Sequence, residues 1–340
     1  MIIVIGGYLF GKDRSGDLRV TGLMAKYCKS VQRFLGIDGK MIVERKKNAL
    51  VTGGTKYDVA AFAVLLLSFL DKNPGLIDEF VVFHDGISKK DQQLLNRILP
   101  SRFVRYSFPG GISGFPEIIK SYFTTMVFCK YECFRLLRDY RNVIWSDYDV
   151  VVAGDLSPLL DENSSGFRVM PDHKLQLKDM FNPLPVQLAE TRYELNAPAV
   201  ATPLFVFSDI MPNQEKYYQW CIEKTCEYVD FLYLPEQAVF TMLLQNFDIH
   251  YSKIPYFPYC VHPELDKEFC GDAVIFHSWG RPKFWSGLDF PLWLKYYHQW
   301  LALGGSPHRE MGKVYPLWQT LKRNLKKHLR EMLKRFHIGK

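Results

Sequence analysis

From residue 49 onward, short apolar runs alternate with longer helix-like segments, and this alternation limits the fold more than any other feature of the chain. The runs ALVTG, EFVVFHD and NVIW have the length and composition of buried strands. Residues 59–70 and 88–98 have the length of helices, and Ser88 can cap the second of them. The alternation predicts an α/β fold, with a mostly parallel sheet covered by helices on both faces. Such sheets bind ligands at the carboxyl ends of their strands.

Further elements follow the same pattern toward the carboxyl terminus. We expect a helix over residues 121–137, a strand at LFVF, a helix over residues 213–227, and another helix where AVFTMLLQ follows Glu236 and Gln237. The strand DAVIF ends at His277. Before residue 49, the sequence predicts a strand at MIIVI and a helix near residues 23–34.

Two carboxylates, Asp147 and Asp149, interrupt the apolar run NVIWSDYDVVV. A buried, unpaired carboxylate costs several kcal/mol or gives up its charge, so the pair needs a counterion. No Lys or Arg occurs between residues 142 and 160. Extended residues two apart lie about 7 Å apart on one side of a strand, so both aspartates can reach one cation, while Ser146 and Tyr148 face the other way. Alternatively, the chain turns at Ser146 and both aspartates are solvated loop residues.

The segment HSWGRPKFW, which begins at His277, places an imidazole at the carboxyl end of another strand. Gly280 lets the backbone approach a ligand closely, and Lys283 is a point charge suited to phosphate. Two carboxylates and one imidazole with phosphate oxygens favour manganese or magnesium over zinc. A single histidine at a strand end is also commonly a hydrogen-bonded structural residue.

These two segments resemble the signatures of the retaining family 8 glycosyltransferases. NVIWSDYDVVVAGDL is similar to the family's D-x-D strand, and HSWGRPKFW is similar to its H-x-x-G-x-x-K-P-W motif. The second match retains His277, Gly280, Lys283 and Trp285. The sequence departs from the family pattern at Phe284, which usually is proline, and at Ser146, which usually is leucine.

Other family segments occur in the same order along the chain, between about residues 49 and 285. VTGGTKYDVAAFAVLLLSFL resembles the first βα unit, in which a tyrosine such as Tyr57 stacks on the nucleotide base; Gly53, Gly54, Thr55 and Lys56 stand where the family usually reads uracil with an acidic or amide side chain. ELNAPAVATPLFVF resembles the N-A-G strand that contacts the donor sugar, with Asn196 retained and Pro198 in place of glycine. LPEQAVFTMLL resembles the D-Q-x-x-L-N segment, with Gln237 retained and Glu236 in place of aspartate.

The resemblance implies a Rossmann-like fold of the GT-A type and a transferase that uses a nucleotide sugar, UDP-hexose. It implies that Asp147, Asp149 and His277 hold Mn²⁺ or Mg²⁺ beside the donor diphosphate. It also implies that the donor is bound by Thr52, Tyr57, Asp147, Tyr148, Asn196, Gly280 and Lys283. We expect retention of anomeric configuration by front-face attack, because Gln237 at the matching position is a poor nucleophile. Glu236 and Asp172 are the alternative catalytic carboxylates, unless they are ordinary exposed acids.

The formal net charge of +7 comes from the carboxyl terminus, because residues 321–340 contain eight basic residues and one acidic residue. Leucines and other apolar residues recur every three or four positions over residues 317–340, which predicts a basic amphipathic helix. Such a helix suits an anionic membrane surface. Alternatively, its apolar stripe packs on the catalytic domain. The resemblance to bacterial enzymes that build surface glycans, lipopolysaccharide or capsule, implies a lipid-linked saccharide acceptor.

We therefore expect three regions: an N-terminal extension packed on or beside the core, residues 1–48; a GT-A catalytic domain, residues 49–300; and a membrane-associating helical tail, residues 301–340. The amino terminus lacks the features of a secretory leader, and no run approaches 18 apolar residues, so we expect a peripheral protein on the cytoplasmic face of the membrane. Seven scattered cysteines without a C-x-x-C pair argue for a reducing compartment. The sequence does not indicate the oligomeric state.

Two other classes of function compete with the enzyme. A nucleic-acid binder would explain the basic charge, but one terminal helix on a neutral remainder is a poor surface for reading a groove, so we expect no nucleic-acid partner. A catalytically inactive, transferase-like glycan-binding protein would explain the departures from the family pattern at Gly54, Ser146, Pro198 and Phe284.

Overall fold

The computed structural model describes residues 2–5, 8–12, 18–20 and 46–313, except 113, 118, 161–164 and 190–192. The helix expected near residues 23–34 and the basic tail over 317–340 lie outside the described residues. The chain forms two compact units, Met1–Arg45 and Lys46–Lys340. The first contains a three-stranded antiparallel sheet of β1 (Ile2–Ile5), β2 (Tyr8–Lys12) and β3 (Leu18–Val20).

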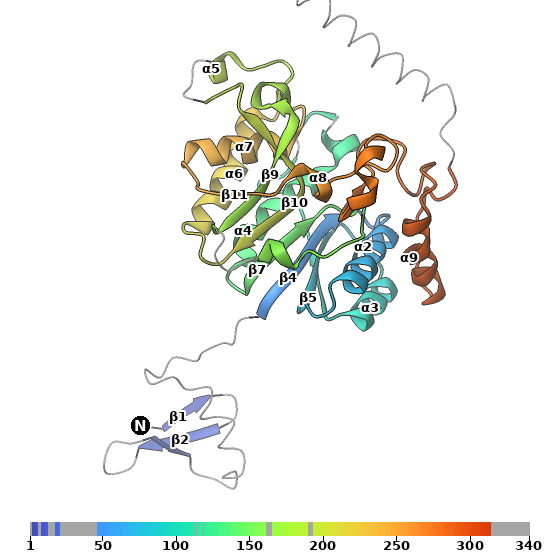
Figure 1. Cartoon of the computed structure of the whole chain (residues 1–340). Coiled ribbons are helices and arrows are strands. Elements are labelled where there is room, and N and C mark those ends of the chain that lie inside the picture. Colours follow the sequence, from blue (N-terminus) through green and yellow to red (C-terminus); the bar gives the residue numbers. More distant parts are fainter. Residues whose placement is uncertain are drawn as a thin grey trace, which may run out of the picture. The chain divides into compact units, whose positions relative to one another are not determined.

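A seven-stranded sheet forms the centre of the second unit (Figure 1). Its strands, in spatial order, are β11 (Ser252–Lys253), β9 (Phe167–Gln176), β10 (Pro198–Ser208), β7 (Tyr140–Ser146), β4 (Lys46–Gly54), β5 (Glu79–His84) and β6 (Ser101–Arg105). The four strands from β7 to β6 are mutually parallel, and β10 is antiparallel to both of its neighbours. The carboxyl ends of four strands therefore meet at one edge of the sheet.

Helices cover both faces of this sheet, which confirms the expected α/β architecture. The alternation along β4 shows why: Ala49 and Val51 are buried in one core cluster, and Leu50 is buried in the other. The helices of the two faces are α2 (Val59–Lys72), α3 (Lys89–Ile98) and α9 (Pro291–Ala302) on one side, and α4 (Glu132–Leu136), α6 (Gln214–Tyr228) and α7 (Pro235–Asn246) on the other (Figure 1). Ser88 caps α3 as expected, and its hydroxyl accepts a hydrogen bond from Asp91 N at 3.1 Å.

Residues 121–137 do not form the single helix that the sequence predicts. A π-helical turn covers Ile119–Phe123, a 3₁₀ segment covers Thr125–Tyr131, and α4 follows. The break lies at Thr124, whose φ of 57° is unfavourable for a β-branched residue and ends the first turn. The Thr124 hydroxyl accepts a hydrogen bond from Met126 N at 3.3 Å, which starts the next turn. This arrangement buries Lys130.

The two acidic residues lie in a bend rather than within a strand. β7 ends at Ser146, and β8 (Val150–Val152) leaves the central sheet to pair with β12 (Ile275–His277). The expectation of a continuous strand is therefore wrong, and the alternative of a turn at Ser146 is correct in its geometry. Its second part is wrong for Asp149, which is buried rather than solvated. The remaining described elements are two short α-helices, α5 (Val186–Ala189) and α8 (Tyr256–Tyr259), and three 3₁₀ segments, Ser157–Leu160, Leu177–Met180 and Lys267–Asp272.

Candidate functional site

The bend at residues 147–149 is fixed by backbone contacts to two other strands. Asp147 N donates to Pro203 O of β10 at 2.9 Å, and Ser278 N donates to Asp149 O at 3.0 Å. The β8 and β12 pairing sets His277 opposite Val150. Three segments that are far apart in the sequence are thereby joined at the carboxyl end of β7.

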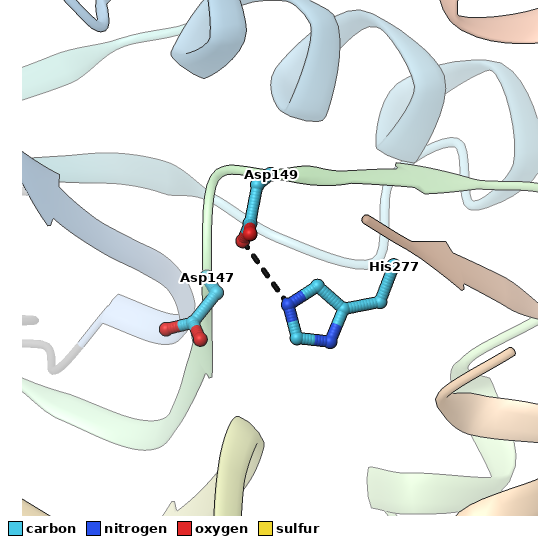
Figure 2. A group of neighbouring side chains, drawn as sticks. All are labelled: Asp147, Asp149 and His277. Atoms are coloured by element: carbon cyan, nitrogen blue, oxygen red, sulfur yellow. Dashed lines mark ion pairs between the residues drawn. The ribbon is translucent and has the colours of Figure 1, made fainter. Parts of the chain in front are cut away.

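Asp147, Asp149 and His277 converge at this point, as the sequence predicts (Figure 2). One ligand atom from each lies within 4.8 Å of the others. His277 Nε2 lies 3.2 Å from Asp149 Oδ1, and His277 Nδ1 lies 3.4 Å from the sulfur of Cys260. Two carboxylate oxygens and one imidazole nitrogen are a donor set that suits Mn²⁺ or Mg²⁺.

Two lysines supply positive charge to the aspartates. Lys283 Nζ donates to Asp149 Oδ2 and to Ser278 O, the latter at 2.9 Å. Lys130 Nζ lies 3.0 Å from Asp147 Oδ1 and 2.8 Å from Glu236 Oε1. Sequence reasoning considered only residues 142–160 and missed Lys130. The available signal was a lysine within the apolar run MVFCKYECF, because a cation that is buried there needs an acidic partner.

The charges in this cluster stabilise one another against burial. Burial disfavours the anionic form of Asp149, but Lys283 and His277 outweigh it and hold the pKa of that carboxyl well below its usual range. Burial alone would lower the pKa of His277, whereas Asp149 and then Cys260 raise it to about 10. Burial likewise opposes the charge of Lys130, yet Asp147 and Glu236 raise the pKa of that ammonium above its usual value. His277 and Lys130 are therefore both cationic at neutral pH.

The two residues expected at the reacting carbon have different environments. Glu236 is buried, and it accepts hydrogen bonds from Lys130 Nζ and Thr202 Oγ1, each at 2.8 Å. It is therefore not an ordinary exposed acid. Gln237 follows it directly in α7, and the Oε1 of Gln237 is buried without a hydrogen-bond partner among the described residues. That amide oxygen can accept a hydrogen bond from a ligand.

Asp172, the other carboxylate considered, has a local structural role. Its Oδ1 accepts hydrogen bonds from Lys174 N at 2.8 Å and from Leu175 N at 2.9 Å, which fixes the end of β9. It does not belong to the group formed by the two aspartates and His277.

Residues expected to bind the nucleotide are distributed around the end of β4. Tyr57 is 41% exposed and lies in the turn between β4 and α2. Thr52 is fully buried, and its hydroxyl has no hydrogen-bond partner within the described part of the chain. Tyr148 packs edge-on to Phe62, with ring centroids 5.3 Å apart, and stacks on Trp285 at 6.0 Å. Thr52 thus lies beneath the site surface and Tyr148 is partly buried, so Tyr57 is the most exposed of these three residues.

The side chain of Asn196 forms a hydrogen bond with Lys178. Asn196 lies in an exposed turn, where its Oδ1 accepts a hydrogen bond from Lys178 Nζ at 2.6 Å. The part of β10 that contacts Asp147 is Pro203, and about 16 Å of extended strand separates it from Pro198. The neighbouring residue Thr202 contacts Lys130 and Glu236, so this segment of β10 faces the site. The role expected for Asn196 at the donor sugar stays a prediction.

Two further features shape the ligand side of the site. Gly280 has a φ of +74°, and no atom would lie within 4 Å of a Cβ at this position, so it provides a left-handed turn beside open space. A cavity of about 340 Å³ lies at the carboxyl ends of β4, β5 and β6, where Thr55, Asp85 and Tyr106 contribute to its wall. This is the edge at which parallel sheets bind ligands.

Comparisons with known proteins agree with this geometry. The family model described as Glycosyl transferase family 8 matches residues 49–289. The solved structure of the bifunctional glycosyltransferase WbbM superposes with a TM-score of 0.59 at 12% identity, over 78% of this chain and 52% of that chain. This chain thus spans about half of WbbM. The galactosyltransferase LgtC, solved with donor and acceptor sugar analogues, superposes with a TM-score of 0.52 at 16% identity, over 80% and 99% of the two chains. A search of curated proteins gives no match.

Proposed function

Because the chain belongs to glycosyltransferase family 8 and has the GT-A fold, we propose that it transfers a hexose from UDP-hexose to a saccharide acceptor with the aid of a divalent cation. The single observation that carries the proposal is the convergence of Asp147, Asp149 and His277 within 4.8 Å at the carboxyl end of the central sheet.

The three side chains fit a divalent cation in both donor chemistry and spacing. Trp145 Nε1 and Lys130 Nζ both contact Oδ1 of Asp147, at 3.0 Å each, and Oδ2 has no partner among the described residues. An oxygen of Asp147 is therefore available for coordination beside Asp149 and His277. When bound, Mn²⁺ or Mg²⁺ would act as a Lewis acid that stabilises the negative charge on the departing diphosphate.

Lys283 and Lys130 have distinct roles in this proposal. Lys283 is held at Asp149 and is 24% exposed, so its ammonium can turn to the donor diphosphate. Lys130 is 5% exposed and is anchored by Asp147 and Glu236, so it orients those two carboxylates. Positive charge that is fixed before reaction stabilises the transition state more than the ground state.

Front-face attack suits the residues beside the reacting carbon. A covalent route needs an unpaired carboxylate, whereas Glu236 is engaged with Lys130 and Thr202, and Gln237 is an amide. The unpartnered Oε1 of Gln237 can orient a sugar hydroxyl. A donor phosphate oxygen would accept the acceptor proton, so the acceptor oxygen attacks on the face from which the diphosphate leaves, and the configuration is retained.

The proposal also includes the location of the protein and the class of its acceptor. The basic amphipathic pattern of residues 317–340 supports peripheral binding to an anionic membrane surface at its cytoplasmic face. A lipid-linked saccharide of lipopolysaccharide or capsule synthesis is the acceptor that suits this location. Among the described residues, no helix is long and apolar enough to cross a bilayer.

A thermal-shift panel of nucleotide sugars with and without Mn²⁺ tests the proposal. We expect one UDP-hexose to raise the Tm only when Mn²⁺ is present, and Asp149→Ala to abolish the shift because it removes a ligand of the cation. Asp272→Ala, which removes an exposed carboxylate near β12, is the control and should keep the shift. If no nucleotide sugar stabilises the protein, the proposal is wrong. Release of UDP from the bound donor distinguishes a transferase from a glycan-binding protein without catalysis.

A further inference from the structure

A short segment that follows α9 reaches the turn containing Tyr57. Ser306 donates from its backbone N and its hydroxyl to the carboxylate of Asp91, at 3.0 and 2.8 Å. Its carbonyl accepts a hydrogen bond from Trp300 Nε1 at 2.8 Å. At Gly305, a Cβ would lie 1.9 Å from the Trp300 ring, so only glycine permits this approach. The backbone at residues 305–306 is therefore held in place.

His308 is a second anchor of the same segment. It is 5% exposed and stacks on Trp285, with ring centroids 4.4 Å apart and 28° between the planes. Its Nδ1 accepts a hydrogen bond from Glu310 N at 3.1 Å. Its Nε2 lies 3.6 Å from Asp58 Oδ1, at the start of α2. Both anchors fix the main chain on either side of residue 307.

Arg309 extends from this fixed main chain over the ring of Tyr57. Its guanidinium carbon lies 4.1 Å from the ring centroid, and Lys56 Nζ lies 5.2 Å from the same centroid. Aromatic groups in van der Waals contact are separated by about 3.5 to 4 Å, so the guanidinium occupies the position that a stacked base would take on that face. Arg309 itself is exposed, and an exposed cation–π contact is weak.

We propose that Arg309 is a gate of the donor site, which competes with the nucleotide base for the face of Tyr57. The donor binds when the Arg309 side chain swings off the ring, while Ser306 and His308 keep the backbone in place. This inference rests on the proposed function, because it takes a nucleotide as the ligand of Tyr57.

Competition and ordinary electrostatics predict opposite effects of removing Arg309. If the guanidinium only attracted the donor diphosphate, its loss would weaken nucleotide binding. If the guanidinium covers Tyr57, removing Arg309 exposes the ring to the base. The nucleotide should then bind more tightly by the free energy of an exposed cation–π contact, which corresponds to about two- to fivefold in affinity. Uridine separates the two effects further, because it has the base without the phosphates.

Titration calorimetry with UDP plus Mn²⁺ and with uridine tests the gate in the full-length protein. We expect Arg309→Ala to bind both ligands about two- to fivefold more tightly than the unmodified protein. Lys313→Ala removes an equal charge from an exposed side chain of the same segment and should not tighten binding. In a Tyr57→Ala background, Arg309→Ala should have no further effect, because the competed surface is gone.

The results separate the inference from the proposed function. If the unmodified protein binds UDP, but Arg309→Ala binds it equally or more weakly, the gate is wrong and the proposed function stands. Equal tightening by Lys313→Ala also contradicts the gate, since the effect would then not depend on the contact between Arg309 and Tyr57. If neither the unmodified protein nor any variant binds UDP or uridine, the proposed function fails and the gate fails with it.

Discussion

At the scale of residues, the site is a balanced set of charges rather than two acids awaiting a cation. Its members are Asp147, Asp149, Glu236, Lys130, Lys283 and His277. Removing one member of such a group destabilises the fold, because its partner is then left as an unpaired buried charge. The same balance allows the protein to hold its carboxylates close together before a ligand arrives.

Deprotonation of His277 should lower the stability of the folded protein as the pH rises. Its pKa is raised from 6.5 to about 10 in the folded state, so its stabilisation is complete below pH 6.5 and is lost as the pH rises toward 10. We expect the free energy of unfolding, measured with a chelator present, to fall by about 1.4 kcal/mol per pH unit between pH 7 and 9. Asp149, Asp147 and Cys260 are the titratable groups that face the imidazole.

Denaturant titration of two variants, and of the protein with added Mn²⁺, tests whether His277 causes this decline in stability. His277→Gln should flatten the decline, whereas His250→Gln, which changes an exposed imidazole, should retain it. A metal ligand must be a neutral imidazole, so stabilisation by added Mn²⁺ should increase with pH over the same range. A decline that is equally steep in His277→Gln would show that another group is responsible.

At the scale of elements, the end of β4 and the acidic bend form one packed unit. A Cβ at Gly54 would lie 2.8 Å from Tyr148 Cε1 and 3.0 Å from Phe62 Cζ. Only glycine at residue 54 therefore leaves room for the Tyr148 ring. Tyr148 is the residue between the two aspartates. A departure from the family pattern at residue 54 thus has a steric explanation within this chain.

The substitution Gly54→Ala in β4 should displace Tyr148 and, with it, the two aspartates of the metal site. We expect a loss of stability of about 1 to 3 kcal/mol, because Tyr148 must move, and a weaker affinity for Mn²⁺ because Asp147 and Asp149 move with it. Gly271→Ala is the matched control, since no atom lies within 4 Å of its Cβ position. Urea unfolding and Mn²⁺ titration measure the two effects. Normal Mn²⁺ affinity in a destabilised Gly54→Ala variant would show that the bend is independent of β4.

Sequence patterns predicted the elements well and the contacts between them only in part. Apolar periodicity identified β4, α2 and β5, because these elements are buried along most of their length, and the Ser88 cap marked the start of the largely exposed α3. It did not detect the break at Thr124, and it gave the bend after Ser146 only as an alternative, since both depend on tertiary packing. The triad of Asp147, Asp149 and His277 was predictable because its residues lie at the ends of the strands β7, β8 and β12. The apolar run around Lys130 indicates a buried cation, but not that its partner Glu236 lies 106 positions away.

At the scale of the whole molecule, the excess positive charge belongs to the tail and not to the catalytic unit. The net charge is +7, and residues 321–340 contribute eight basic residues against one acid. A chain with its excess charge at one end can bind an anionic surface there and leave its sheet edge to a soluble donor. The two tasks would then be separable by substitutions in the tail alone.

The triple variant Lys326→Gln, Lys327→Gln and Arg330→Gln tests this separation in the full-length chain. Each basic residue near an anionic surface contributes about 1 kcal/mol, so the variant should bind phosphatidylserine-containing vesicles roughly a hundredfold more weakly. Its Tm shift with UDP-hexose and Mn²⁺ should not change, because the triad lies in a different segment. A double variant of the exposed α3 lysines, Lys89→Gln and Lys90→Gln, is the control for lost charge in cosedimentation assays. Equal weakening in that control would indicate general electrostatic attraction, and unchanged vesicle binding by the triple variant would favour a tail that packs on the catalytic unit.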